Sequence, residues 1–440
     1  MIVTIRTGES ICRGFSDASF CVTLLVHFIS LEDLDSRTMI YDFDTPIERR
    51  STHSAKWNYY AEDVLPLWVA DMDFRSPEPV VQALHQRVDH GIFGYPGDQP
   101  ALRQLIVDRF ANRYHASITP DQIVFMPGMV LALNVICRTF AKEGDGVLVQ
   151  TPVYPPFLSA PTNSGRLSQR APLKQTRKDG KLHIEMDFEA MEAAITPETK
   201  IFILCNPHNP VGRVFTREEL EKLAAFVIKH DLLLVSDEIH CDLLLDRVEH
   251  ITLSALLPQF PELHSRLITL QAPSKTFNIA GLACSYAVIP DEKLRTKLHH
   301  AFYSSGMFVN ALGLTAAEAA FRDGEEWLSQ VLDYLRANRE AMIAYLREHL
   351  PDAALAPVEG TYLAWIDLSA YNLPGGAAKF CAEEAKVGLN DGSTFGGAAY
   401  AQFVRLNFGC TRAMLLQALD RVCGAVNAFC AVPKNPASGD

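Results

Sequence analysis

Three polar residues stand where apolar, strand-like runs end, and together they could hold a reactive cofactor. Asn209 follows the run at residues 201–204, Asp237 ends a second run, and Lys275 follows a third at residues 267–270. Parallel strands end at one edge of a sheet, where open α/β sheets bind their ligands. A lysine, a carboxylate and an amide at that edge can hold pyridoxal 5′-phosphate (PLP). The lysine forms a Schiff base, the carboxylate keeps the pyridine nitrogen protonated, and the amide bonds the ring hydroxyl.

Each of these residues also has a plain structural interpretation. A lysine is usually a solvated surface charge, but Lys275 follows an apolar strand and the tripeptide Ala-Pro-Ser, which indicates a semi-buried turn. Desolvation there lowers the pKa of the amine and makes it a competent nucleophile. Asp237 could instead cap a helix, with Glu238 as the functional acid, and Asn209 could simply form an Asn-Pro turn. The order and strand-end positions of all three favour the cofactor site.

Other residues could complete such a site. Gly128 and Met129 open an expected helix, and backbone N–H groups there suit a phosphate dianion. Tyr154 follows a strand and could stack on a cofactor ring or pack in the core. Arg405 lies inside an apolar strand, where a guanidinium needs a carboxylate from either a substrate or an internal acid. The chain has neither a GxGxxG after a strand nor a GxxxxGK[ST], so nicotinamide and nucleoside triphosphate sites lack support.

Composition narrows the class of protein. The chain has 440 residues, of which 48% are hydrophobic, enough for a large core and two domains. Its net charge of −12 argues against nucleic acid as a partner. Ten cysteines occur without a CxxC pair, which favours free thiols in the cytoplasm over disulfides or a metal site. No segment reaches the roughly 18 apolar residues of a membrane span.

The order of expected elements predicts the domain organisation. Short apolar strands alternate with helices through the middle of the chain, which indicates a mostly parallel sheet covered on both faces. After about residue 310 the order of expected helices and strands changes to an α+β pattern, so we expect a smaller C-terminal domain there. The predicted divisions are an N-terminal extension, disordered or preceding a true start at Met39 (1–38), a segment packing with the small domain (39–76), a large PLP-binding domain (77–310), a small domain (311–432) and a tail (433–440).

Five longer motifs carry a family resemblance. They are WVADMDF at residues 68–74, HGIFGY at 90–95, CNPHNP at 205–210, SDEIH at 236–240 and APSKTFNIAGL at 272–282. In this order they resemble the MalY/PatB group of cystathionine β-lyases, within the fold type I PLP enzymes of the aspartate aminotransferase superfamily. The resemblance implies an α/β large domain with a mostly parallel seven-stranded sheet between helices, and a smaller α+β C-terminal domain.

The resemblance also implies roles around the cofactor ring. Lys275 would hold PLP and later move the Cα proton of the substrate. Asp237 would pair with the pyridine nitrogen, Asn209 with the ring oxygen, and Tyr154 would stack on the ring. His240 stands where many relatives carry a ring-contacting tyrosine.

Further roles concern the phosphate and the substrate. The Gly128 and Met129 amides would hold the phosphate together with Ser274. Tyr95 matches a tyrosine that reaches the phosphate of a neighbouring subunit, which implies a homodimer with shared sites. Arg405 matches the arginine that clamps the substrate α-carboxylate.

Departures from the wider superfamily concern the phosphate and the substrate. Ala272 and Ala283 stand where many aminotransferases have a serine and an arginine for phosphate, and Asp391 stands where a proline is usual in a substrate-bordering loop. The expected activity is β-cleavage of L-cystathionine or other cysteine S-conjugates to a thiol (homocysteine), pyruvate and ammonia. The alternatives are a class I/II aminotransferase and a regulatory or binding protein built on a PLP fold.

Overall fold

The computed structural model describes residues 40–432. Contacts group the described chain from Tyr41 onward into one compact unit. The extension expected at residues 1–38 and the tail at 433–440 lie outside the described residues. The division expected near residue 310 stays a prediction, because the contacts do not separate the unit there.

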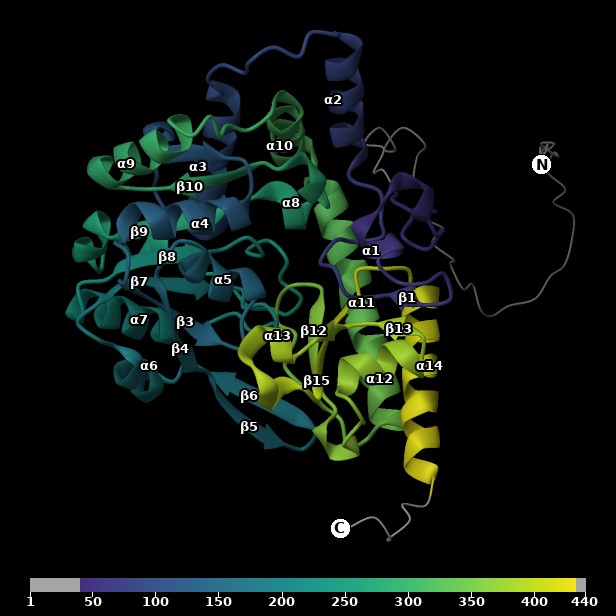
Figure 1. The fold of residues 1–440 in the computed structure, drawn as a ribbon. Helices are drawn as coiled ribbons and strands as arrows, with labels where there is room; N and C mark the ends of the chain where they lie inside the picture. Colours follow the sequence, from purple (N-terminus) through teal and green to yellow (C-terminus); the bar gives the residue numbers. More distant parts are fainter. Residues whose placement is uncertain (1–39, 433–440) are drawn as a thin grey trace, which may run out of the picture. The chain divides into compact units, whose positions relative to one another are not determined.

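A seven-stranded sheet dominates the part of the chain before residue 290 (Figure 1). Its strand order is β2–β10–β9–β8–β7–β3–β4, and only β10 runs antiparallel to its neighbours. The mostly parallel seven-stranded sheet expected from the sequence is therefore confirmed. The strands are β2 (Ile123–Met126), β3 (Gly146–Thr151), β4 (Leu167–Pro172), β7 (Thr199–Cys205), β8 (Leu233–Asp237), β9 (Leu267–Gln271) and β10 (Ser285–Val288).

Helices cover both faces of this sheet, which explains why its strands are continuously apolar. In β7, Ile201 and Ile203 join a core cluster with α4, whereas Phe202 and Leu204 join a cluster with α7 on the other face. Alternate side chains point to opposite faces of a strand, so both faces need apolar residues. The surrounding helices are α4 (Met129–Phe140), α5 (Pro155–Asn163), α6 (Phe188–Ala194), α7 (Arg217–Lys229) and α9 (Glu292–Tyr303).

Helix α7 begins with a capping box. The Thr216 hydroxyl accepts the Glu219 N–H at 3.2 Å, and the Glu219 carboxylate accepts the Thr216 N–H at 2.8 Å. Two of the four orphan donors at the helix start are satisfied in this way. The helix begins at Arg217 and ends at Lys229.

A second, six-stranded sheet has the order β14–β15–β12–β11–β6–β5. Strands β5 (Lys174–Lys178) and β6 (Lys181–Glu185) belong to it, although they lie well before residue 310; β6 pairs with β11 through Leu355 and Lys181. The sequence signals did not indicate this exchange between sheets. The other strands are β11 (Ala354–Leu355), β12 (Leu363–Asp367), β14 (Asn390–Asp391) and β15 (Phe403–Asn407).

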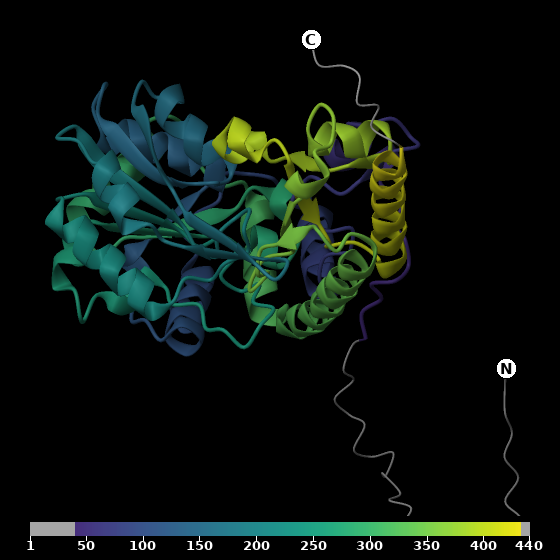
Figure 2. The same cartoon turned by 90° about the horizontal axis from the view of Figure 1, so that it is seen from below.

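Long helices flank the second sheet and the remaining core. Figure 2 shows α11 (Glu325–His349) beside the closing helix α14 (Arg412–Ala431), and the two helices pack together. Helix α10 (Ala311–Asp323) packs on α2 (Glu78–Asp89) and α3 (Pro100–Tyr114). Shorter helices are α1 (Ala55–Asn58), α8 (Pro273–Thr276), α12 (Ala377–Glu383) and α13 (Ser393–Gly396).

Residues 68–74 form neither a helix nor a strand. Only Leu65–Pro66 forms a short strand, β1, which pairs with β13 (Val387–Gly388). Backbone hydrogen bonds hold the segment against the chain that follows β15 of the second sheet. One of them runs from the Asp73 N–H to Gly409 O at 2.8 Å. The segment therefore crosses from the first strand of the unit toward the carboxyl ends of the large sheet.

Residues 40–432 contain no disulfide, no candidate metal site and no helix suited to cross a membrane. The eight cysteines in this range are free, and no group of His, Cys, Asp or Glu there could hold a metal ion. No helix within the same range is long and apolar enough to cross a membrane.

Candidate active site

A cavity of about 310 Å³ lies where the two sheets approach each other. Its walls come from the carboxyl ends of β7, β8 and β9, the start of α4, the 68–74 segment, and β14 with β15. All site residues expected from the sequence line this cavity except Tyr95. They are Gly128, Met129, Tyr154, Asn209, Asp237, His240, Ser274, Lys275 and Arg405.

Lys275 lies in α8, the single helical turn after β9. Its Nζ donates a hydrogen bond to the Ala70 carbonyl oxygen at 2.7 Å. Burial lowers the pKa of Lys275 to about 8, and the nearby Arg405 adds to the effect, although Asp71 and Asp237 oppose it. A substantial share of the amine is therefore neutral near physiological pH, as a nucleophile or base requires.

Asp237 is the carboxylate that faces the cavity. Its side chain is buried and accepts the Ile239 N–H at 3.1 Å, and within residues 40–432 it forms no ion pair. Burial raises the pKa of Asp237 to about 7, with a further contribution from Glu238. Glu238, the other candidate acid, is bonded elsewhere, to His250 and Gln271, each at 3.1 Å. The geometry thus separates two neighbouring acids that the sequence could not rank on its own.

Arg405 brings a buried cation to the cavity from β15. Its guanidinium donates to Asn209 Oδ1 and to the Trp68 carbonyl, both at 2.9 Å, and to Asn390 Oδ1 at 2.6 Å. All three acceptors are neutral, and Nε is buried without a hydrogen-bond partner. Burial lowers the pKa of Arg405 to about 10. Among the described residues no internal acid pairs with it, so the partner that a buried guanidinium needs is left to an incoming anion.

The start of α4 forms a backbone cradle beside Ser274. Gly128 has φ +108°, a conformation that other residues rarely adopt, and a Cβ there would meet no neighbouring atom within 4 Å. The Gly128 N–H is already donated to Met126 O at 2.9 Å and lies 3.2 Å from Ser285 Oγ. The first-turn amides of Met129 and Val130 are thus better placed for an anion, since such groups have no acceptor within the helix.

His240 and Tyr154 present rings to the cavity. His240 is buried, its Nδ1 lacks a hydrogen-bond partner, and burial lowers its pKa to about 3, so the imidazole is neutral. Tyr154 is half-buried immediately before α5, and burial raises its pKa. Its hydroxyl is therefore protonated at neutral pH.

Tyr95 lies outside this cavity. It is 90% exposed, and its ring contacts Phe308 at a centroid distance of 5.7 Å. The role expected for it in a neighbouring subunit stays a prediction.

Four groups at the site were not assigned a role from the sequence. Ala70 O accepts hydrogen bonds from Lys275 Nζ and, at 2.8 Å, from the Tyr362 hydroxyl. Trp68 contributes its carbonyl, and Asn390 its side chain, to Arg405. The motif at 68–74 was visible in the sequence, but carbonyl directions are not. Asp391, flagged as unusual, does not line the cavity and instead accepts the Ser393 N–H at 2.8 Å.

Comparisons with known proteins agree with this geometry. Residues 62–422 match the aminotransferase class I and II family. Cystathionine beta-lyase PatB of Bacillus subtilis (strain 168) is 39% identical over 394 residues, covering 88% of this chain and 100% of that protein. Protein MalY of Escherichia coli (strain K12) is 31% identical, covering 89% of this chain and 100% of MalY. The PLP-containing structure of cystalysin from Treponema denticola is 32% identical with a TM-score of 0.83, covering 89% and 100% of the two chains.

The chain belongs to the aminotransferase class I and II family and has the PLP fold type I. Within it, the chain is a PLP-dependent enzyme of the PatB/MalY group of carbon–sulfur lyases. The cofactor is therefore PLP.

The residues at the cavity fit that cofactor. Asp237 is a buried carboxylate that forms no ion pair within residues 40–432, and a protonated ring nitrogen would give it one. Lys275 offers an amine with a lowered pKa, and the first turn of α4 offers amides to the phosphate.

Proposed function

We propose that the protein is a PLP-dependent C–S β-lyase that cleaves L-cystathionine or other cysteine S-conjugates, with uptake of one water, to a thiol (homocysteine from cystathionine), pyruvate and ammonia. The observation that carries the proposal is the cavity shared by Lys275, Asp237 and Arg405. The names of two relatives, cystathionine beta-lyase PatB and the cystathionine beta-lyase of Corynebacterium glutamicum, support a sulfur substrate. The neutral contacts of Arg405 leave room for the α-carboxylate of an amino acid.

In this proposal Lys275 and Asp237 are the residues of the chain that act in the proton-transfer step. Lys275 holds the cofactor and then removes the proton from the substrate Cα, because its pKa of about 8 makes the free amine available. When bound, PLP supplies a ring that accepts the electrons left at Cα. Asp237 keeps the ring nitrogen protonated, since ionising this buried carboxylate is favourable only beside a cation.

Arg405 and Asn209 position the substrate. Arg405 holds the α-carboxylate, and Asn209 fixes the guanidinium through the 2.9 Å bond to Nη1. The β-sulfur then departs as a thiolate, a good leaving group because an ordinary thiol has a pKa of about 8.5. Small displacements of Arg405 would misplace Cα relative to Lys275 and slow proton removal.

The test is thiol and pyruvate release from L-cystathionine by the PLP-loaded enzyme, with no keto acid added. We expect both products in equal amounts, and we expect none from Lys275→Ala. An aminotransferase, which the family description also suggests, would need a keto acid and would return no thiol. Keto-acid dependence without thiol release would overturn the lyase proposal. A binding or regulatory role would survive in Lys275→Ala, because it would not require the amine.

The assembly and location are part of the same proposal. A homodimer is supported by the cluster of exposed apolar residues around Tyr95, namely Ile92, Phe93 and Phe308. In such a dimer Tyr95 would reach the phosphate bound by the partner subunit. The free cysteines within the described residues support a reducing, cytoplasmic location.

A further inference from the structure

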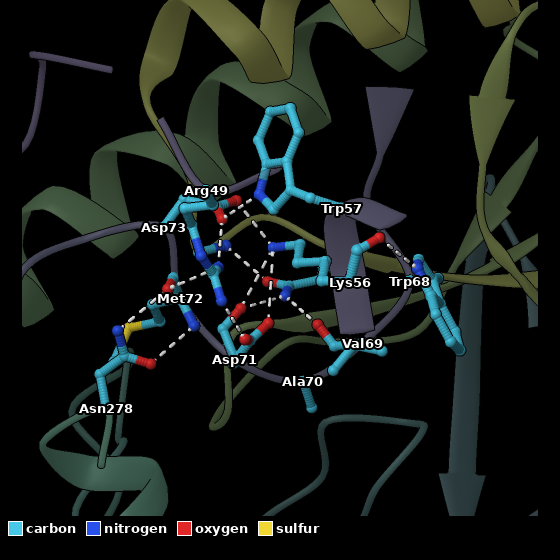
Figure 3. A network of polar contacts seen from close by, with 12 residues as sticks. Arg49, Lys56, Trp57, Trp68, Val69, Ala70, Asp71, Met72, Asp73 and Asn278 are labelled. Atoms are coloured by element: carbon cyan, nitrogen blue, oxygen red, sulfur yellow. Dashed lines mark hydrogen bonds and ion pairs between the residues drawn. The ribbon is translucent and has the colours of Figure 1, made fainter. Parts of the chain in front are cut away.

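A largely buried charge cluster lies behind the cavity. None of its side chains forms a hydrogen bond or ion pair with Lys275, Asp237 or Arg405, although burial lowers the pKa of Lys275 and the charge of Asp71 opposes that shift. It consists of Arg49, Lys56, Asp71 and Asp73, and Figure 3 shows these side chains converging with Trp57. Lys56 Nζ lies 2.7 Å from Asp73 Oδ2, and the exposed fractions of the two side chains are 0% and 5%. Removing an ion pair from water is costly, so such a pair invites a functional explanation.

The carboxylate of Asp73 collects three donors. Besides Lys56, it accepts Arg49 Nη1 at 2.5 Å and Trp57 Nε1 at 2.9 Å. Burial alone would raise the pKa of Asp73, but the charges of Lys56 and Arg49 and their hydrogen bonds lower it below its ordinary value. Arg49 also binds Asp71 at 2.6 Å. The two positive and two negative charges of the cluster therefore neutralise one another.

The cluster and its neighbours form hydrogen bonds to the backbone of the 68–74 segment as well as to its side chains. Lys56 Nζ donates to Asp71 O at 3.2 Å, and the Trp68 indole donates to Lys56 O at 3.1 Å. Asn407, two residues after Arg405, donates to Asp71 O at 2.8 Å. Asn278, three residues after Lys275, donates to Met72 O at 2.9 Å (Figure 3).

The segment so held supplies carbonyl oxygens to both functional cations. Ala70 O accepts Lys275 Nζ at 2.7 Å, and Trp68 O accepts Arg405 Nη2 at 2.9 Å. The two carbonyls lie two residues apart on one stretch of backbone. Any rotation of that backbone therefore moves the acceptors of Lys275 and Arg405 together.

We propose that Lys56 and Asp73 are positioning residues, whose buried ion pair orients the Ala70 and Trp68 carbonyls and so aligns Lys275 with Arg405. The proposal rests on the functional roles proposed above for Lys275 and Arg405, but not on carbon–sulfur cleavage. It predicts that breaking the pair impairs the hold on any α-amino acid, whether or not a leaving group is present.

The test uses the PLP-loaded enzyme and L-alanine, which has no β leaving group. Absorbance of bound PLP is titrated with L-alanine in wild type, Lys56→Met and Asp73→Asn, at a temperature where each is folded. We expect alanine affinity to fall by about tenfold in both variants, the loss associated with one misplaced hydrogen bond to a charged group. The titration does not need C–S cleavage. A negative result here can therefore be distinguished from a failure of the proposed lyase activity.

The two variants separate geometry from charge. Lys56→Met removes a positive charge and Asp73→Asn removes a negative one, so a field effect on the substrate carboxylate would weaken binding in the first and strengthen it in the second. A shared weakening identifies geometry. Opposite changes, or wild-type affinity in both folded variants, would overturn the proposal.

A matched control separates positioning from stability. Arg339→Met breaks a comparably buried arginine's bonds to Asp246 and Val358 O, away from the cavity. It should lower Tm and leave alanine affinity unchanged. If Lys56→Met does not fold, Trp57→Phe carries the test, because it removes one bond to Asp73 and keeps both charges. We expect about threefold weaker alanine binding there, and wild-type affinity would overturn the proposal.

Discussion

Replacing Asp237 by Asn should stabilise the protein when PLP is absent. The carboxylate is 3% exposed and forms no ion pair within residues 40–432. Burial raises its pKa to about 7 from an ordinary 3.8, although the charge of Lys275 acts in the opposite direction. Because the folded-state pKa lies above the unfolded one, stability is highest below 3.8 and falls as pH rises through 7. A shift of about 3 pKa units corresponds to roughly 4 kcal/mol, taken as an upper figure. Asn, which never ionises, avoids this cost.

The assay is urea unfolding of the PLP-free protein at about pH 5 and about pH 8.5. We expect Asp237→Asn to be more stable than wild type at the higher pH, by about 2 kcal/mol after local relaxation, with a smaller gain at the lower pH. With PLP bound the order should reverse, because the ring nitrogen gives the wild-type carboxylate its cation. Lyase activity of the variant should fall by at least about 100-fold.

Asp242→Asn provides the matched control, since it removes an equally buried carboxylate five residues away. Burial would raise the pKa of Asp242, but the charges of Arg109 and Arg113 lower it to about 2. Stability from this group is present above 3.8 and lost as pH falls through 2, so its removal should destabilise the protein at neutral pH. If both variants lose stability alike, or if Asp237→Asn gains none at high pH, the inferred cost of ionising the buried Asp237 carboxylate is wrong.

Three further predictions concern the substrate and the assembly. Arg405→Met should reduce kcat/KM by about 100-fold or more, because it removes the cation proposed to bind the substrate carboxylate. Steady-state thiol release measures this, and a folded variant with an unchanged KM would refute the proposed role. Asn390→Ala should lower kcat/KM by about threefold to tenfold through loss of the 2.6 Å bond to Arg405. Mixing inactive Tyr95→Phe with inactive Lys275→Ala should restore activity if Tyr95 serves the partner's site, since a hybrid dimer then contains one intact site; no recovery in verified hybrids would place Tyr95 elsewhere.

Much of the site could be predicted from the sequence because its parts are local. Asn209, Asp237 and Lys275 each stand at the end of an apolar run, and the rule that parallel strands end at one edge places them together. The same continuous apolar runs predicted a sheet covered on both faces, which the two clusters around β7 confirm. These inferences needed only the period of a strand and the direction of its end.

Other parts depended on distant contacts that no local pattern encodes. Whether Asp237 or Glu238 faces the cavity follows from where Glu238 finds its donors. Whether Arg405 meets an internal acid depended on which groups reach its guanidinium, and the acceptors that bond to it are neutral. The joining of β6 to the second sheet likewise follows from its pairing with β11.

By itself, the order of residues determined which chemical groups stand at which strand ends, because strand period and strand direction are local properties of the backbone. Only the tertiary structure decided what those groups touch. The Ala70 carbonyl illustrates the difference, since an alanine carries no side-chain signal and its oxygen reaches Lys275 only through the course of the 68–74 segment. Hydrogen-bond geometry of this kind arises when segments far apart in the chain pack together, so it is set by the whole fold.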